Sequence, residues 1–165
     1  MENKSDLEGI RLRIDAIDEQ LLTLISERAA LATDVAKLKK GESADTVFYR
    51  PEREAQVLRK IIANNKGPIA DEEMARLFRE FMSACLALEQ HLNVAYLGPE
   101  ATFTQSAALK HFGHSVITKA QISIAEVFRE VESGACHYGV VPIENSIEGA
   151  VNYTLDLLVN SSLKI

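Results

Sequence analysis

Arg28 stands on an otherwise apolar face of a predicted helix. The apolar residues between positions 7 and 38 recur in alternating steps of three and four, the spacing that gathers side chains on one helix face. They are Leu7, Ile10, Ile14, Ile17, Leu21, Leu24, Leu31, Val35 and Leu38. A cation on a buried face costs on the order of several kcal/mol unless an anion meets it. The sequence therefore predicts either an internal carboxylate partner for Arg28 or a bound acid.

Two other cations are related to Arg28 by the helical repeat. An α-helix turns by about 100° per residue, so Lys39 lies roughly 20° from Arg28 around the axis and Arg11 lies roughly 100° away. Arg28 and Lys39 can therefore line one pocket, whereas Arg11 can join it only from the other chain of an antiparallel dimer. Plainer alternatives stay open, namely an internal ion pair for Arg28 and solvated surface charges for Arg11 and Lys39.

The next two predicted helices carry further polar side chains that could contribute to a site. Proline favours the first turn of a helix, so a helix that begins at Pro51 places Arg53 and Glu54 near its start. On the following helix Cys85 and Glu89 are four residues apart and share a face. Each of these residues also has an ordinary structural or surface interpretation.

These side chains depend on three predicted helices, which span about residues 5–40, 51–62 and 71–92. At 1.5 Å per residue the first helix extends about 50 Å, against roughly 20 and 30 Å for the other two. One chain covers such a long apolar face poorly. We therefore expect the first helix to pack against a second copy, which gives an intertwined helical dimer.

The sequence pattern changes near residue 93. Short apolar runs then alternate with helical patterns, which is typical of βαβ units and a mostly parallel sheet. The predicted segments are residues 93–98, 104–112, 115–120, 124–133, 138–143 and 151–159. We predict an α domain at residues 1–92 followed by an α/β domain at residues 93–165.

Two loops of the α/β part carry polar residues before a predicted helix. Helix amino ends with hydroxyl or amide side chains can bind carboxylates, although such residues are most often simple caps. The candidates are Thr102 and Thr104 in the first loop, and Glu144, Asn145 and Ser146 in the second.

Composition narrows the class of protein. The net charge is −6 without a basic block, and no stretch approaches the roughly 20 apolar residues of a membrane span. The two cysteines and four histidines lack metal-ligand spacing. We expect a soluble cytoplasmic protein that binds neither nucleic acid nor membrane and holds no metal.

Three segments, IRLRIDAIDEQLLTLISERAALATDVAKLK, YRPEREAQVL and ARLFREFMSACLALEQ, resemble the all-helical chorismate mutase family over residues 5–92. The resemblance implies a domain-swapped dimer that converts chorismate to prephenate without a cofactor. It also implies that Arg28 and Arg11 of the partner subunit grip the substrate carboxylates. Lys39 would contact a carboxylate and the ether oxygen, Glu54 would bind the hydroxyl, and Arg53 would support the site.

The chain departs from the family pattern at three helical positions. Arg50 stands where an acidic residue is frequent, and Cys85 stands where a serine commonly binds a carboxylate. Glu89 stands where a glutamine often donates a hydrogen bond to the ether oxygen. Because Glu89 must be protonated to donate, we expect turnover to fall as pH rises and Glu89→Gln to flatten the profile.

Two further segments, LGPEATFTQSAA and GVVPIENSIEGAVNYTLD, resemble the opening of a prephenate dehydratase domain, with Ala101 replacing a usual glycine. The resemblance implies a lobe of the periplasmic-binding-protein type, and the whole chain is similar to the amino-terminal part of bifunctional chorismate mutase/prephenate dehydratases. The family's later catalytic segment, threonine-arginine followed by phenylalanine or aspartate, and its regulatory ACT domain are not in this sequence. We therefore expect an incomplete lobe without dehydratase activity, with residues 163–165 as an incipient fourth strand.

Two other functions stay open at this point. An isochorismate pyruvate lyase uses a similar cationic pocket on the same fold. The non-enzymatic alternative is a helical dimerisation module joined to a lobe that binds a small acid, with Arg28 merely ion-paired.

Overall fold

The computed structural model describes residues 2–42, 49–145 and 149–165. The chain divides into two compact units, Met1–Phe48 and Tyr49–Ile165, whose placement relative to one another is not determined. The predicted domain boundary between residues 92 and 93 stays a prediction.

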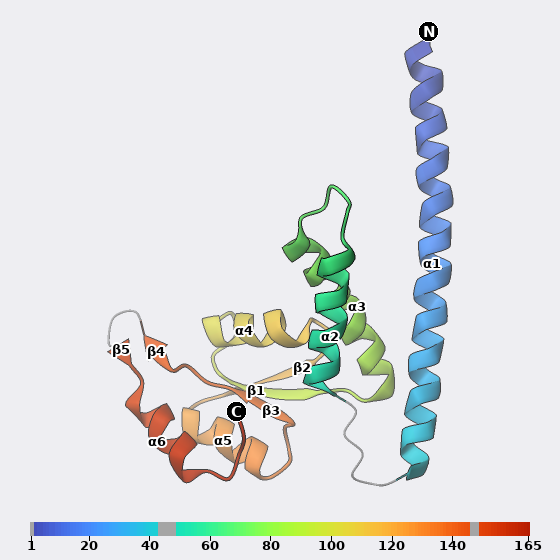
Figure 1. Ribbon diagram of the computed structural model, residues 1–165. Helices are drawn as coiled ribbons and strands as arrows, with labels where there is room; N and C mark the ends of the chain where they lie inside the picture. The colour runs from blue at the N-terminus through green and yellow to red at the C-terminus, as the bar shows by residue number, and fades with distance from the viewer. Residues whose placement is uncertain (1, 43–48, 146–148) are drawn as a thin grey trace. The chain divides into compact units, whose positions relative to one another are not determined.

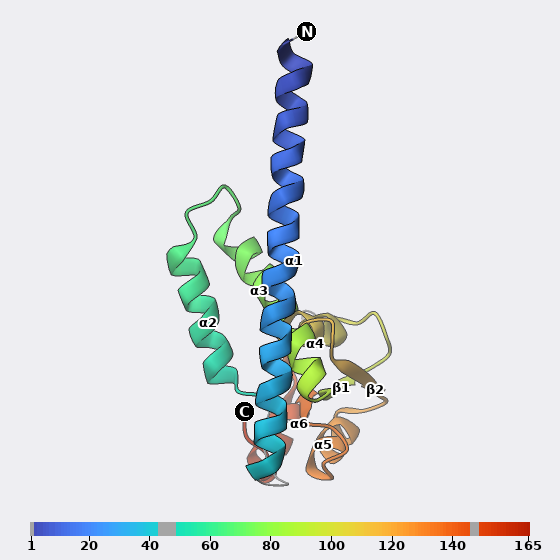
Figure 2. The ribbon, with the colours of Figure 1, turned by 90° about the vertical axis from the view of Figure 1, so that its right-hand side faces the viewer.

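The described part of the first unit is one long helix, α1 (Glu2–Glu42), which Figures 1 and 2 show without a break. It extends slightly past both ends of the predicted segment. The nine residues of the predicted apolar face are all exposed, from 43% at Val35 to 72% at Leu38. We call this set the α1 stripe. A single helix has no interior of its own, so α1 buries these side chains only against another surface.

The second unit begins with a helical hairpin of α2 (Pro51–Asn64) and α3 (Asp71–Glu89), which lie side by side in Figure 2. The predicted helix starts at Pro51 and Asp71 are confirmed. Asn65 holds the turn between them, because its side-chain amide donates to the Ile69 carbonyl at 2.8 Å and to the Asp71 carboxylate at 2.7 Å. The prediction that the third helix continues to residue 92 is wrong, because α3 ends at Glu89.

A parallel three-stranded sheet follows, in the order β2-β1-β3. Its strands are β1 (Asn93–Leu97), β2 (Ile117–Gln121) and β3 (Tyr138–Val140). Helices α4 (Phe103–Phe112) and α5 (Ile124–Glu132) connect the strands and cover opposite faces of the sheet (Figure 1). The predicted βαβ arrangement is confirmed.

Two apolar clusters form the interior of this unit, one on each face of the sheet. Successive residues of a strand point to opposite faces, so the fully buried neighbours Val94 and Ala95 belong to different clusters. The cluster on the α4 face contains Tyr49, Leu92, Val94, Ala108 and Phe112, and the cluster on the α5 face contains Ala95, Val127 and Cys136. Leu92, which was predicted on the third helix, therefore packs in the interior of the lobe.

The carboxyl-terminal segment differs from its prediction in two places. Residues Glu144–Asn145 (β4) pair antiparallel with Gly149–Ala150 (β5), and α6 begins only at Asn152 and ends at Asn160. Residues 144 and 145 therefore form a strand and do not precede a helix directly, because pairing with residues 149 and 150 extends their backbone.

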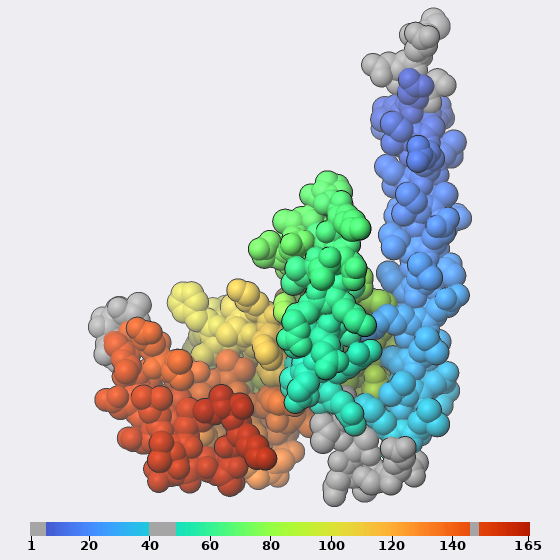
Figure 3. All heavy atoms as spheres, in the orientation of Figure 1, coloured from blue at the N-terminus to red at the C-terminus, as the bar shows by residue number. Residues whose placement is uncertain are grey.

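The prediction of a strand at residues 163–165 is also wrong. Ser161 donates to the Glu132 carboxylate at 2.7 Å and accepts from the Leu163 amide at 3.1 Å. These bonds turn the chain at the end of α6, so the Leu163 amide is used locally. The space-filling view shows α5 and α6, in orange and red, as one continuous surface (Figure 3).

Candidate functional site

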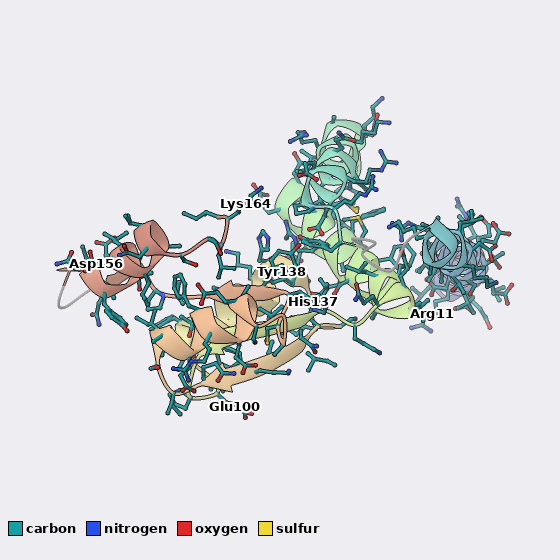
Figure 4. The ribbon with its side chains drawn as sticks, turned by 90° about the horizontal axis from the view of Figure 1, so that it is seen from below. Arg11, Glu100, His137, Tyr138, Asp156 and Lys164 are labelled. Carbon is teal, nitrogen blue, oxygen red and sulfur yellow. The ribbon has the colours of Figure 1, made fainter. Side chains whose placement is uncertain are left out.

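The three predicted cations of the first unit lie along α1. Arg11 is exposed, whereas Arg28 and Lys39 are half-buried. Figure 4 looks nearly along this helix and shows its side chains, Arg11 included, radiating from the axis. Because the placement of α1 against the second unit is not determined, the pocket that would join these cations to α2 and α3 stays a prediction.

The start of α2 places Arg53 and Glu54 as predicted, in the first turns of the helix. The backbone amides of both residues donate to the Arg50 carbonyl at 3.1 Å. Arg50 is the residue before the helix and forms no side-chain cap. Arg53 is exposed to solvent, and the Glu54 side chain is only 18% exposed. Within the first turn, the Arg53 side chain therefore faces solvent, whereas the neighbouring Glu54 carboxylate is largely covered.

Two residues that sequence analysis missed, Tyr49 and Arg79, hold the Glu54 carboxylate. Arg79 lies on α3 and places its Nε 3.5 Å from Glu54 Oε1. Tyr49 donates a side-chain hydrogen bond to Glu54. Tyr49 and Glu54 occupy the positions before the cap and in the fourth helical residue, which lie close together in a hydrophobic staple. An aromatic residue two positions before Pro51 was the sequence signal that could have identified this contact.

Cys85 and Glu89 share a face of α3, as their four-residue spacing predicts. Cys85 is a free thiol and only 4% exposed, and Glu89 is half-buried in the last turn. Their predicted roles in binding a substrate stay predictions.

Thr102 and Thr104 precede and begin α4 as expected, and their hydroxyl groups bond to backbone carbonyls. Thr102 Oγ1 lies 3.0 Å from the Pro99 oxygen, and Thr104 Oγ1 lies 2.5 Å from the Leu97 oxygen. Thr102 forms no side-chain cap on the helix. A substrate carboxylate would have to replace these contacts, so carboxylate binding here stays a prediction.

Ala101, in the same loop, has a positive φ of 62°. Only glycine adopts this left-handed region without a steric penalty, which gives a physical reason for the glycine that the family usually has here. The Ala101 amide donates to Gln105 Oε1 at 2.6 Å, which helps to hold the turn.

Glu144 and Asn145 are exposed on the β4 strand, and Ser146 lies outside the described residues. The expectation that these residues sit at the amino end of a helix is therefore wrong for Glu144 and Asn145. Their role in substrate binding stays a prediction.

The α3 helix is fastened to the loop after α4 by Glu80. This carboxylate accepts from the His114 amide at 2.9 Å and lies 2.8 Å from His114 Nδ1. Burial acts to raise the pKa of Glu80, but the bonds from His114 and nearby positive charge outweigh it and lower the pKa. Gly113 has a φ of 79°, and a Cβ there would lie 2.5 Å from the Ser83 Cβ, so the loop meets α3 at a residue without a side chain.

A cavity of about 770 Å³ lies beside this junction. Its lining comes from α2, α3, α4 and the following loop, and it mixes acidic and basic side chains, among them Arg79, Glu80 and Lys110. None of the described residues that sequence analysis selected lines it.

Within the described ranges, no group of three or more histidine, cysteine, aspartate or glutamate residues is arranged to hold a metal ion. The same search of described residues finds no helix with the length and hydrophobicity of a membrane span.

Comparisons with known proteins divide the chain into two matched parts. Residues 10–90 match the family model for chorismate mutase type II, and residues 94–165 match the model for prephenate dehydratase. Among solved structures, a chorismate mutase (form II) from Thermus thermophilus aligns with 51% of this chain and 93% of its own, at 32% identity and a TM-score of 0.48.

Curated relatives align with the whole of this chain. Proteins named bifunctional chorismate mutase/prephenate dehydratase from Stutzerimonas stutzeri and Pseudomonas aeruginosa are 60% and 61% identical over 168 residues, which is all of this chain and 46% of each relative. The chain thus spans about half the length of these relatives. With both family models matched in the same order, residues 10–90 belong to the chorismate mutase type II family and residues 94–165 to the prephenate dehydratase family, as in the amino-terminal part of these relatives.

Proposed function

We propose that this chain rearranges chorismate to prephenate in a pocket built by its helices. The observation that carries the proposal is Arg28, a half-buried cation on the same face of α1 as the α1 stripe. It lies inside the segment that matches chorismate mutase type II. Lys39 lies on the same side of α1 by the helical repeat. A substrate with two carboxylates matches two cations on one face of a helix, because arginine and lysine side chains bind carboxylates through charge-assisted hydrogen bonds.

The reaction suits fixed cations. A Claisen rearrangement is unimolecular, so catalysis consists of holding the substrate compact and stabilising the charge that builds on the ether oxygen. Arg11 and Arg28 would bind the carboxylates through paired N–H donors, and Lys39 would place a point charge at the ether oxygen. Glu54 would accept a hydrogen bond from the substrate hydroxyl, and Arg53, Cys85 and Glu89 would line the same pocket. No cofactor is needed for this chemistry.

We propose that the pocket forms in a dimer. The α1 stripe leaves nine large apolar side chains exposed, and a second copy of the helix is a surface of matching length and pattern. In that arrangement Arg11 enters the pocket from the partner chain.

For the second part we propose the amino-terminal portion of a prephenate dehydratase domain, beginning at residue 93, which would act on the product of the first part only within a full-length protein. The match of residues 94–165 and the relatives' names support this. Thr102, Thr104, Glu144, Asn145 and Ser146 remain its proposed substrate contacts. We further propose a cytoplasmic location, which suits the buried free thiols of Cys85 and Cys136.

The decisive experiment is to incubate the purified chain with chorismate, follow its loss, and identify the product before and after acid treatment. We expect prephenate, which acid converts to phenylpyruvate. Arg28→Ala should lower kcat/KM by about 10²- to 10³-fold, as removing one preorganised donor does in other enzymes, while dimer and helix content persist. Arg13→Ala, which removes an exposed arginine of the same helix, is the matched control.

Two results would contradict the proposal. Intact chorismate after long incubation with the folded dimer would favour the dimerisation module, which the comparisons do not favour. Release of pyruvate from isochorismate, with chorismate unchanged, would instead indicate the lyase.

A further inference from the structure

Tyr49 is anchored in the interior of the α/β lobe although it lies next to the mutase residues in sequence. Its side chain is only 6% exposed. The ring centroid lies 5.7 Å from that of Phe112 on α4 and 5.5 Å from that of Tyr138 on β3. Tyr138, the first residue of β3, is labelled in Figure 4. The position of the Tyr49 ring is therefore set by residues more than sixty positions later in the chain.

The hydroxyl of this anchored ring donates its hydrogen bond to Glu54. On its other side the Glu54 carboxylate meets Arg79, with 3.5 Å between Nε and Oε1. A carboxylate has about four acceptor positions, so two protein donors fix its orientation and still leave room for a substrate hydroxyl. Glu54 thus has one contact that comes through the lobe interior and one from α3.

The protonation state of Tyr49 preserves its hydrogen bond to Glu54. Burial raises the pKa of Tyr49, and the charge and hydrogen bond of Glu54 raise it further. A tyrosine whose pKa is raised stays protonated throughout the neutral range. Its hydroxyl therefore remains a donor to Glu54.

We propose that Tyr49 is a positioning residue of the mutase pocket, which orients the Glu54 carboxylate for the substrate hydroxyl from an anchor in the interior of the dehydratase lobe. This inference rests on the proposed function, because it assigns a purpose to Glu54 in binding chorismate. It predicts that the affinity of the mutase pocket for chorismate depends on packing in the interior of the second lobe.

The kinetic signature follows from where Glu54 would act. The substrate hydroxyl takes no part in the bonds that break and form, so we expect its contact with Glu54 to contribute about equally to the ground state and the transition state. Loss of such uniform binding raises KM and leaves kcat unchanged. A change in the orientation of the Glu54 carboxylate should therefore raise KM.

Tyr49→Phe tests this, because it keeps the buried ring and removes only the hydroxyl. A hydrogen bond to a charged group is worth enough that we expect KM for chorismate to rise by roughly 10-fold, with kcat within about 2-fold of the parent. Tyr138→Phe, which removes a hydroxyl from the same aromatic cluster, is the matched control and should change neither constant. Circular dichroism and unfolding in urea establish that both variants are folded.

A double-mutant cycle with Glu54→Gln separates positioning from packing. If Tyr49 acts through Glu54, adding Tyr49→Phe to Glu54→Gln should change KM by less than about 2-fold. The inference is overturned if Tyr49→Phe matches Tyr138→Phe, or if its full effect persists beside Glu54→Gln. A parent chain that leaves chorismate intact would overturn the proposed function and this inference together, whereas an active parent with an unaffected Tyr49→Phe would overturn the inference alone.

Discussion

The two units of the molecule use their apolar residues in opposite ways. The α1 stripe exposes its side chains, as with Ile14 and Leu21 at 50% each, whereas the second unit buries Val94, Ala95 and Ala108 completely. The second unit thus has an interior made by its own chain, with two apolar clusters around a parallel sheet. A helix without an interior depends on another surface for stability. The contrast fits the proposal that α1 associates with a second copy, whereas residues 49–165 contain an interior of their own.

The largest effect we expect comes from placing charges on the α1 stripe. Ile14→Glu combined with Leu21→Glu should dissociate the dimer, reduce helical circular dichroism and lower chorismate turnover by more than about 100-fold, because each side chain contributes about 1.5–3 kcal/mol when buried. Sedimentation and kinetics measure this. Leu12→Glu with Leu22→Glu is the control, since both leucines lie off the stripe and are 66% exposed. Equal behaviour of the two pairs of variants would contradict the proposed dimer interface.

The converse change removes a side chain from the interior of the second unit. Phe112→Ala should lower the free energy of unfolding of residues 49–165 by about 3–5 kcal/mol, because it leaves a cavity beside Tyr49 and Tyr138. Urea unfolding followed by tyrosine fluorescence measures this. Phe103→Ala, on the same helix but 96% exposed, should stay within about 0.5 kcal/mol of the parent. A comparable loss in both would argue against the described interior.

A smaller gain is expected at Ala101. Ala101→Gly should raise the free energy of unfolding by about 0.5–1 kcal/mol, because it relieves a left-handed alanine and loses part of that gain to the flexibility of glycine in the unfolded chain. Thermal unfolding measures the change. Ala107→Gly within α4 should act in the opposite direction, by about 1 kcal/mol. If both substitutions destabilise, the positive φ of residue 101 is wrong.

The smallest effect concerns the junction between Glu80 and His114. Because folding lowers the pKa of Glu80, its contribution to stability is present above the ordinary value of 4.5 and is lost as pH falls through the lowered pKa. His114 is largely exposed, so this contribution should be at most about 1 kcal/mol. Urea unfolding between pH 6 and pH 3 should show a shallower decline in Glu80→Gln than in Glu72→Gln. Parallel curves would contradict the assignment.

Periodic patterns predicted most elements because each reflects a local geometry. The stripe predicted α1, Pro51 and Asp71 marked the starts of two helices, and apolar runs alternating with helical patterns predicted the sheet. The short β4–β5 hairpin and the turn at Ser161 were missed, since both depend on contacts between segments.

The site was predictable only in part, for the same physical reason. Residue type and spacing selected Arg28, Lys39 and Glu54 as candidates, and their roles in a site stay predictions. Tyr49 and Arg79 were missed because their importance lies in contacts that only the folded chain creates. Sequence patterns also could not reveal that the hydroxyl groups of Thr102 and Thr104 bond to backbone carbonyls of their own loop.

The most direct test of a pocket shared by two chains is to mix two inactive variants. Arg11→Ala and Arg28→Ala should each be nearly inactive alone, and co-refolding them should restore about a quarter of the parent turnover. Half of the dimers would then be mixed, and one of the two pockets in each mixed dimer would contain both arginines. Turnover that stays at the sum of the two variants, although mass spectrometry finds mixed dimers, would contradict the account.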